Sequence, residues 1–118
     1  MKKFGQARFY FECALELEPE NVVALGSMVW FLEHSKKYDE ALEYCEKALK
    51  INPNYVYAIS YKGKLLLLLK KYEESLKCYN KAIKLEPTNQ TAIFHRFKVQ
   101  EKLDEMNKES FLKRLTKL

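Results

Sequence analysis

The sequence predicts an all-α fold built from repeated pairs of antiparallel helices, and three observations support this. Pro19, Pro53 and Pro87 recur at intervals of 34 residues and close similar phrases: ALELEPEN, ALKINPNY and AIKLEPTN. Between them, apolar and small residues recur at three- and four-residue steps, the period of a helix with one buried face. The chain has only three glycines and three prolines, a composition that favours helix. A period of this length is typical of stacked helical repeats.

The first expected element is a helix over 4–18 that carries the pattern of a repeat's second helix. Phe4, Ala7 and Phe11 hold its packing positions, yet no first helix precedes them. Solenoids normally end on polar faces, and an aromatic residue such as Phe9 does not suit such an end. Two explanations stay open. We favour the chain being a piece of a longer array; the alternative is that a second copy covers the aromatic face.

Two complete repeats are expected over 22–55 and 56–89. In the first, residues 22–34 predict one largely apolar helix and residues 38–51 an amphipathic second helix, joined by a short turn at 35–37. The proline near the end of each repeat should terminate the second helix. It lacks an amide hydrogen and disfavours the helical conformation in the residue before it.

Small residues are expected where paired helices approach most closely, because bulky side chains there would force the helices apart. The set consists of Ala41, Ala48, Gly63, Ser75 and Ala82. Tyr38 and Tyr72 open the second helices and should fill the wedge between neighbours. Cys45 stands where the adjacent repeats have Phe11 and Tyr79, so we expect it to fill core space.

The C-terminal region is expected to hold a first helix over 90–103 and a separate capping helix over 107–118. Tyr38 with Ala41 and Tyr72 with Ser75 form an aromatic–x–x–small phrase (Tyr-x-x-Ala in the first case) at the start of each second helix, and this phrase is absent from the C-terminal region. In the capping helix, Phe111, Leu112, Leu115 and Leu118 would share one face. The chain, 1–118, is thus expected to form one domain: a half-repeat over 1–21, repeats over 22–55 and 56–89, and a first helix plus cap over 90–118.

These residues resemble the tetratricopeptide repeat, a family with small residues in both helices, an aromatic residue opening the second helix and a proline at its end. The resemblance covers about residues 4–103 and implies a right-handed superhelix (a solenoid) of antiparallel helix pairs, with about seven helices. The chain departs from the family at Leu25, Ile59 and Ile93, where tryptophan is usual. The RNA-reading pentatricopeptide family has a similar unit, but the closing prolines and the Tyr-x-x-Ala phrases favour the protein-binding relative.

The family's first helices line a concave groove, and the resemblance carries its groove-facing positions onto this chain. The candidate binding residues are Val23, Trp30, His34, Tyr57, Ser60, Lys64, Leu67, Leu68, Phe94, Lys98 and Lys102. Their aromatic and cationic mixture suggests a protein or peptide partner with a large apolar side chain near acidic groups or a C-terminal carboxylate.

Alternatives remain for several of these residues. Trp30 and Tyr57 could pack between helices, with the lysines merely solvated. The leucine run 65–69 could be buried between repeats, or could offer Leu67 and Leu68 as a groove floor or a patch for self-association.

One subtype of the family clamps the C-terminal carboxylates of heat-shock chaperones with Lys, Asn and Arg residues in successive first helices. Lys64 and Lys98 are present, but no asparagine lies inside an expected first helix. The clamp is therefore incomplete, and we do not expect that role.

Other functions are disfavoured. His34 and His95 lack metal-ligand spacing to a cysteine or carboxylate, and no glycine-rich loop could hold phosphate, so we expect no enzyme, metal or cofactor. The charge of +5 is interleaved along helices and does not favour nucleic acid. The longest apolar run is too short for a membrane span, and three dispersed cysteines suit the cytoplasm. A protein-interaction scaffold is the leading expectation, with self-assembly through the N-terminal helix second and RNA binding third.

Overall fold

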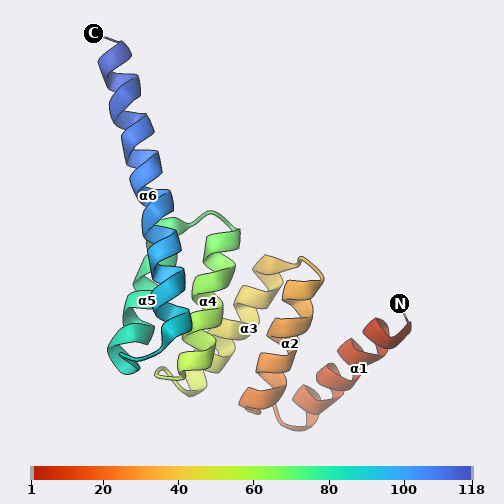
Figure 1. Cartoon of the computed structure of the whole chain (residues 1–118). Helices are drawn as coiled ribbons and strands as arrows, with labels where there is room; N and C mark the ends of the chain where they lie inside the picture. The colour runs from red at the N-terminus through yellow and green to blue at the C-terminus, as the bar shows by residue number, and fades with distance from the viewer. Residues whose placement is uncertain (1, 118) are drawn as a thin grey trace.

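The computed structural model describes the backbone of residues 2–117 and the side chains of residues 5–117. Within that part of the chain there are six helices (Figure 1). They are α1 (Lys2–Leu17), α2 (Val22–His34), α3 (Tyr38–Ile51), α4 (Val56–Leu68), α5 (Tyr72–Leu85) and α6 (Gln90–Thr116). The side chains of Phe4 and Leu118, which the sequence places on apolar faces, lie outside the described residues. None of the described helices is both long enough and apolar enough to cross a membrane.

Each helix packs against the next along the chain, so neighbouring helices are antiparallel. The first helices α2, α4 and α6 form one layer and the second helices α3 and α5 form the other (Figure 1). The prediction of an all-α array of antiparallel helix pairs is confirmed. The ranges predicted for the first repeat, 22–34 and 38–51, are those of α2 and α3.

Both inner turns between paired helices use the same backbone device. Lys36 and Lys70 adopt left-handed conformations, with φ of 60° and 61°. In the first turn the amide of Lys37 donates to the carbonyl of Leu32 at 2.8 Å, and in the second the amide of Lys71 donates to Leu66 at the same distance. These bonds satisfy carbonyl groups that a helix end leaves free, and they reverse the chain within three residues.

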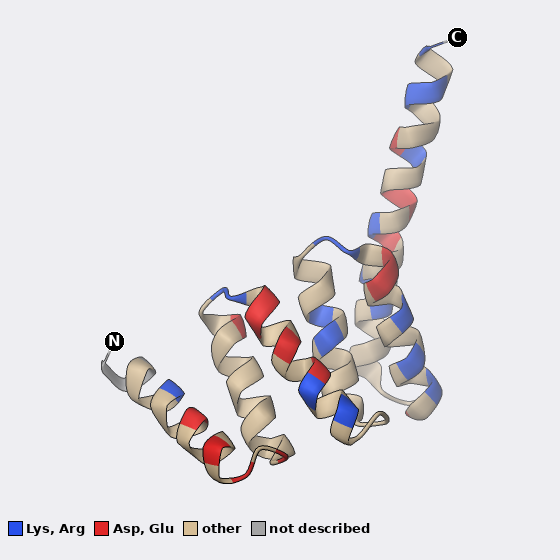
Figure 2. Ribbon diagram, turned by 180° about the vertical axis from the view of Figure 1, so that it is seen from behind, with Lys and Arg blue, Asp and Glu red and all other residues tan. Residues whose placement is uncertain are grey.

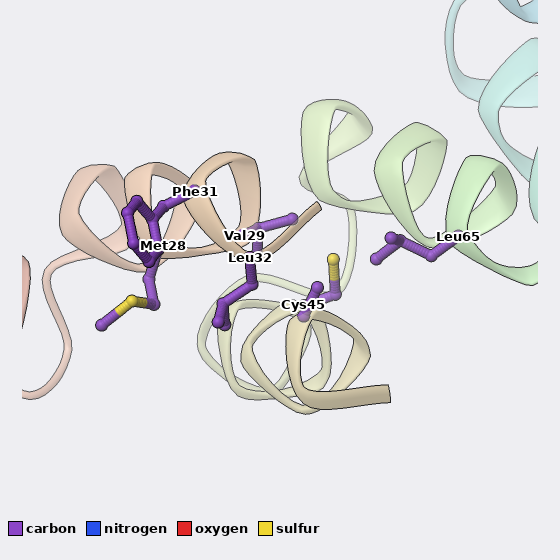
Figure 3. Packing of buried hydrophobic residues seen from close by; sticks show 7 residues of the cluster. Met28, Val29, Phe31, Leu32, Cys45 and Leu65 are labelled. Carbon is purple, nitrogen blue, oxygen red and sulfur yellow. The ribbon is translucent and has the colours of Figure 1, made fainter. Parts of the chain in front are cut away.

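The core lies between the layers. Figure 3 shows the cluster shared by α2, α3 and α4, in which Met28, Leu32 and Leu65 are fully buried. The five small residues expected at the closest helix approaches are all buried. Cys45 is 1% exposed, which confirms its expected role in filling the core, and burial raises the pKa of its thiol to about 12.

The expected number of helices was wrong: there are six described helices and not seven, because α6 continues without a break from Gln90 to Thr116. The separate capping helix over 107–118 is therefore not formed. No proline or glycine interrupts α6, and Asp, Glu, Met and Asn at 104–107 are all compatible with helix. Residues 104–117 are exposed, and this part of α6 projects beyond the other helices (Figure 1).

Candidate functional site

A hollow of about 740 Å³ lies between α4 and α6. Its wall comes from both helices, from α5 and from the turns that precede α4 and α6. The lining includes Asn54, Tyr55, Tyr57, Ser60, Tyr61, Lys64, Tyr79, Asn89, Thr91 and His95. Tyrosine rings therefore make up much of the wall, with polar groups at the two turns.

A second hollow of about 290 Å³ lies along α2. It is lined by Val23, Gly26 and Trp30 of α2, by Phe11 of α1, and by Tyr55 and Tyr57. Because these two tyrosines also line the larger hollow, the two spaces adjoin. We call them together the first-helix groove.

Two aromatic side chains stand half-exposed in this groove: Trp30 is 45% exposed and Tyr57 is 46% exposed. The Trp30 ring lies against His34, with ring centroids 4.3 Å apart, and Tyr57 contacts Tyr61 at 5.3 Å. The Tyr57 ring also packs close to Gly26, since a Cβ atom added at Gly26 would lie 3.3 Å from it. Neither Trp30 nor Tyr57 is a buried core residue.

A partly buried carboxylate ties α2 to α4 beneath these rings. Lys64 donates from Nζ to Oε1 of Glu33 at 3.2 Å, and the side chain of Glu33 is only 13% exposed. Burial, followed by a hydrogen bond to Glu33, raises the pKa of Tyr61. The positive charge of Lys64 is thus already balanced within the protein, which the sequence did not predict.

His34 and His95 each use one ring nitrogen in a contact within their own helix. Nδ1 lies 2.9 Å from the Trp30 carbonyl oxygen in His34, and 2.7 Å from the Thr91 carbonyl oxygen in His95. A carbonyl only accepts, so Nδ1 carries the proton and Nε2 is the acceptor in the neutral ring. The His95 ring also stacks on Tyr79, with centroids 5.5 Å apart and planes 15° apart. This stacking orients the ring at the groove wall.

Ser60 contributes an unusual polar atom to the same wall. Its Oγ atom is buried and has no hydrogen-bond partner, the single such side-chain atom among the described residues. Buried hydroxyl groups normally find a partner, because leaving one unpaired costs about 1–3 kcal/mol. A bound ligand that reached Ser60 could supply it.

The structure brings together part of the predicted set. Tyr57, Ser60 and Lys64 line the larger hollow, and Val23 and Trp30 line the smaller one. The other predicted residues lie outside both linings. His34 packs on Trp30. Phe94 and Lys98 form an exposed pair in which the Lys98 Nζ atom lies 5.5 Å from the centroid of the Phe94 ring. Lys102 and Leu68 are exposed, and Leu67 packs against the core cluster around Ile59 and Tyr79.

Sequence reasoning missed several lining residues. Tyr61 could have been found, because it lies one helical turn after Tyr57 and so shares its face. Asn54 and Tyr55 belong to the turn before α4, which a search restricted to first helices leaves out. His95 reaches the groove because its ring stacks across helices on Tyr79.

The expected aromatic face on α1 is present. Phe9 is 61% exposed and Tyr10 is 65% exposed, and their rings meet edge to face at 5.9 Å. Ala7, Phe11 and Ala14 are only half-buried, whereas the equivalent residues of α3 and α5 are fully buried. In the described chain, α1 therefore shows the face that a first helix covers in the inner repeats.

Comparison with known proteins gives consistent results. The sequence profile of the tetratricopeptide repeat matches residues 31–55 and 56–89, while no curated protein sequence matches significantly. The first TPR of Spaghetti (RPAP3) bound to HSP90 peptide SRMEEVD superimposes with a TM-score of 0.82 and 27% identity, covering 87% of this chain and 82% of that one. The first TPR domain of human RPAP3 superimposes with a TM-score of 0.83 and 26% identity, covering 91% of this chain and 84% of that one. The Sgt2 TPR domain from Aspergillus fumigatus shares the fold, with a TM-score of 0.82 and 23% identity over 91% of this chain and 72% of that one.

Proposed function

Because the chain belongs to the tetratricopeptide repeat family of non-catalytic binding modules, we propose that it is a scaffold that holds a short peptide in the first-helix groove. One observation carries the proposal. Trp30 and Tyr57 stand half-exposed beside two adjoining hollows, although aromatic rings of this size normally seek burial. Aromatic side chains in such positions commonly provide most of the binding energy of a complex.

The groove favours a peptide with an apolar side chain at one end and acidic groups at the other. The apolar side chain would contact Trp30 and Tyr57 on α2 and α4. Lys64 is already paired with Glu33, so the available positive charge comes from α6. Lys98 and Lys102 are exposed there and form no ion pair within the described part of the chain. They would attract an acidic segment toward α6, which speeds association and orients the peptide in the groove.

The peptide in the Spaghetti complex, SRMEEVD, has this composition, since it combines Met and Val with three acidic residues. It is therefore a suitable first probe. The asparagines at the groove, Asn52, Asn54 and Asn89, come from turns and not from first helices. Asn89 is also occupied, because its Oδ1 accepts from the amide of Ala92 to cap α6. We accordingly propose a ligand of this chemical class and leave the clamp for chaperone carboxylates outside the proposal.

Titration calorimetry with SRMEEVD tests the proposal. Trp30→Ala and Tyr57→Ala should each weaken binding about 30-fold, the effect of removing an interface anchor. Lys98→Glu should weaken it about five-fold at low salt and less at high salt. A peptide with Ala in place of Met and Val should lose most of its affinity, and one with amides in place of its acids should lose the salt dependence.

Matched controls lie on the second helices. Leu85→Ala removes an apolar side chain of similar exposure from α5, and Lys77→Glu reverses an exposed charge there. Both should bind the peptide as the unaltered protein does. If Trp30→Ala and Tyr57→Ala keep their circular dichroism and still bind with unaltered affinity, the groove is not the site. Absence of saturable binding to both SRMEEVD and a library of random heptapeptides would contradict the scaffold proposal itself.

A further inference from the structure

The far side of α6 carries a surface that the equivalent helices bury. In α2 and α4 the positions that contact the second helix of the same repeat are buried, as Val29 is at 2% exposure. On α6 the equivalent residue is Phe97, which is 63% exposed. Ile93, Phe97 and Gln100 border a hollow of about 270 Å³ together with Leu76 and Asn80 of α5. This hollow lies beside α6 at the position equivalent to the one that α3 fills beside α2 in the first repeat.

The same face continues along the projecting part of α6. It is formed by Ile93, Phe97, Gln100, Asp104, Lys108, Phe111 and Leu115, which we call the α6 stripe. Steps of four, three and four residues repeat every 11 residues in this set, so its members lie along one nearly straight line on the helix. Phe111 is 56% exposed and Leu115 is 47% exposed. Thr91 and His95, which line the first-helix groove, point to the other side of α6.

The α6 stripe is complementary to itself when a second copy runs antiparallel to it. With the two-fold axis between Asp104 and Lys108, these two charges face each other across the interface. The same register sets Phe97 opposite Leu115, and it sets Gln100 opposite Leu112, one residue from Phe111. Each pairing occurs twice, because a two-fold interface repeats every contact. The ends of the stripe are thus apolar, and its centre pairs opposite charges.

We propose that two copies of the chain associate through α6 in this antiparallel register. The C-terminal half of each α6 enters the hollow between α5 and α6 of the other copy. Its direction is that of a second helix in the inner repeats, where α3 runs antiparallel to α2 and α5 to α4. A helix of 27 residues is about 40 Å long, enough for the projecting half to reach the other copy's hollow (Figure 1).

Charge supports this partner over an unrelated one. Acidic and basic residues are interleaved along α6 (Figure 2), so a helix with a single sign of charge would meet repulsion in part of the stripe. Within the stripe, Gln100 donates from Nε2 to Oδ1 of Asp104 at 3.1 Å. That bond holds the Asp104 carboxylate where the partner's Lys108 would meet it. The proposal is independent of the first-helix groove, which the association leaves open.

Sedimentation equilibrium on the full chain from about 5 to 500 µM tests the proposal, and the expected result is a reversible dimer. Asp104→Lys and Lys108→Asp each place like charges opposite one another, and each should weaken association about ten-fold or more. The double variant restores opposite charges and should dimerise again. An equimolar mixture of the two single variants should form mixed dimers, because each lysine then faces an aspartate.

Leu115→Asp tests the apolar ends. It should also weaken association about ten-fold. Leu115 is exposed, so the fold should survive. Met106→Asp is the matched control: Met106 is 51% exposed but lies on the opposite face of α6, and dimerisation should persist. A monomer throughout the concentration range overturns the proposal. So does a mixture of the charge variants that stays monomeric, or a dimer lost with Phe9→Asp on α1 but kept with Leu115→Asp.

Discussion

Repeat 22–55 and repeat 56–89 build the same helix pair with different side chains at its tightest point. In the first repeat, Val29 of α2 lies near Cys45 of α3, and both are buried (Figure 3). In the second, the equivalent residues are Gly63 and Tyr79. The Tyr79 ring fills the space beside Gly63, and a Cβ atom added there would lie 2.9 Å from it. Compared with the first repeat, the second repeat therefore has a smaller side chain on its first helix and a larger one on its second helix at this point.

The backbone differs little between the two repeats. Both first helices have 13 residues and both second helices 14, and Lys36 and Lys70 reverse the chain with nearly the same φ. The repeat is therefore defined by its backbone path and by the total volume between its helices. Close packing constrains the total side-chain volume between the two helices more strongly than it constrains the size of either side chain alone.

The largest expected effect comes from replacing Gly63 and Tyr79 by valine and cysteine, the residues that the first repeat has at the equivalent positions. Tyr79→Cys should destabilise by about 3 kcal/mol because it leaves a cavity. Gly63→Val should cost about 2 kcal/mol because its methyl groups meet the Tyr79 ring. The double variant should cost at least about 1 kcal/mol less than the sum. Urea denaturation measures all three, and strict additivity would contradict the volume exchange.

The two first-helix glycines should respond to alanine with opposite signs. Gly63→Ala places a Cβ atom 2.9 Å from the Tyr79 ring, which is 1% exposed, and should destabilise by about 1–2 kcal/mol. Gly26→Ala meets Tyr57 at 3.3 Å, and that ring is half-exposed and can shift. The gain in helix propensity should then stabilise by up to about 0.5 kcal/mol. Thermal melts of both variants check the contrast; a shift in the same direction for both would contradict it.

Where the repeats share their backbone, equal effects are expected. Lys36→Gly and Lys70→Gly replace residues held at φ of 60° and 61° by the residue that tolerates this conformation best. Each should stabilise by about 0.5–1 kcal/mol, and the two values should agree. Midpoints of urea unfolding provide the comparison. A large difference between them would show that the two turns are not equivalent.

The smallest effect concerns Lys62, which replaces the Met28 of the first repeat and pairs with Glu46 at 2.7 Å. Both side chains are partly exposed, so Lys62→Met should change stability by less than about 0.5 kcal/mol. The hydrogen bond to Glu46 raises the pKa of Lys62 above its usual 10.5, although burial opposes this. The contribution is therefore present below pH 10.5 and lost as pH rises through the higher folded-state pKa. Unfolding at pH 8 and pH 11 should show it.

Sequence reasoning succeeded where local chemistry determines structure. The bounds of α2 and α3 follow from apolar spacing and from the proline at 53, and the buried small residues follow from the same period. It failed at α6, where the absence of a second-helix phrase suggested a break although no residue at 104–107 disfavours helix. It also missed the pairing of Lys64 with Glu33, since the contact joins residues 31 apart.

In the proposed function, the first helices bind a peptide through Trp30 and Tyr57. Chemical-shift mapping of amide and indole resonances during titration with SRMEEVD tests it most directly. We expect progressive shifts at the Trp30 indole and at Tyr57, Ser60 and His95, with α3 and the outward face of α5 unchanged. Shifts concentrated on α1, α3 or the α6 stripe, with the Trp30 indole unmoved at saturation, would contradict it.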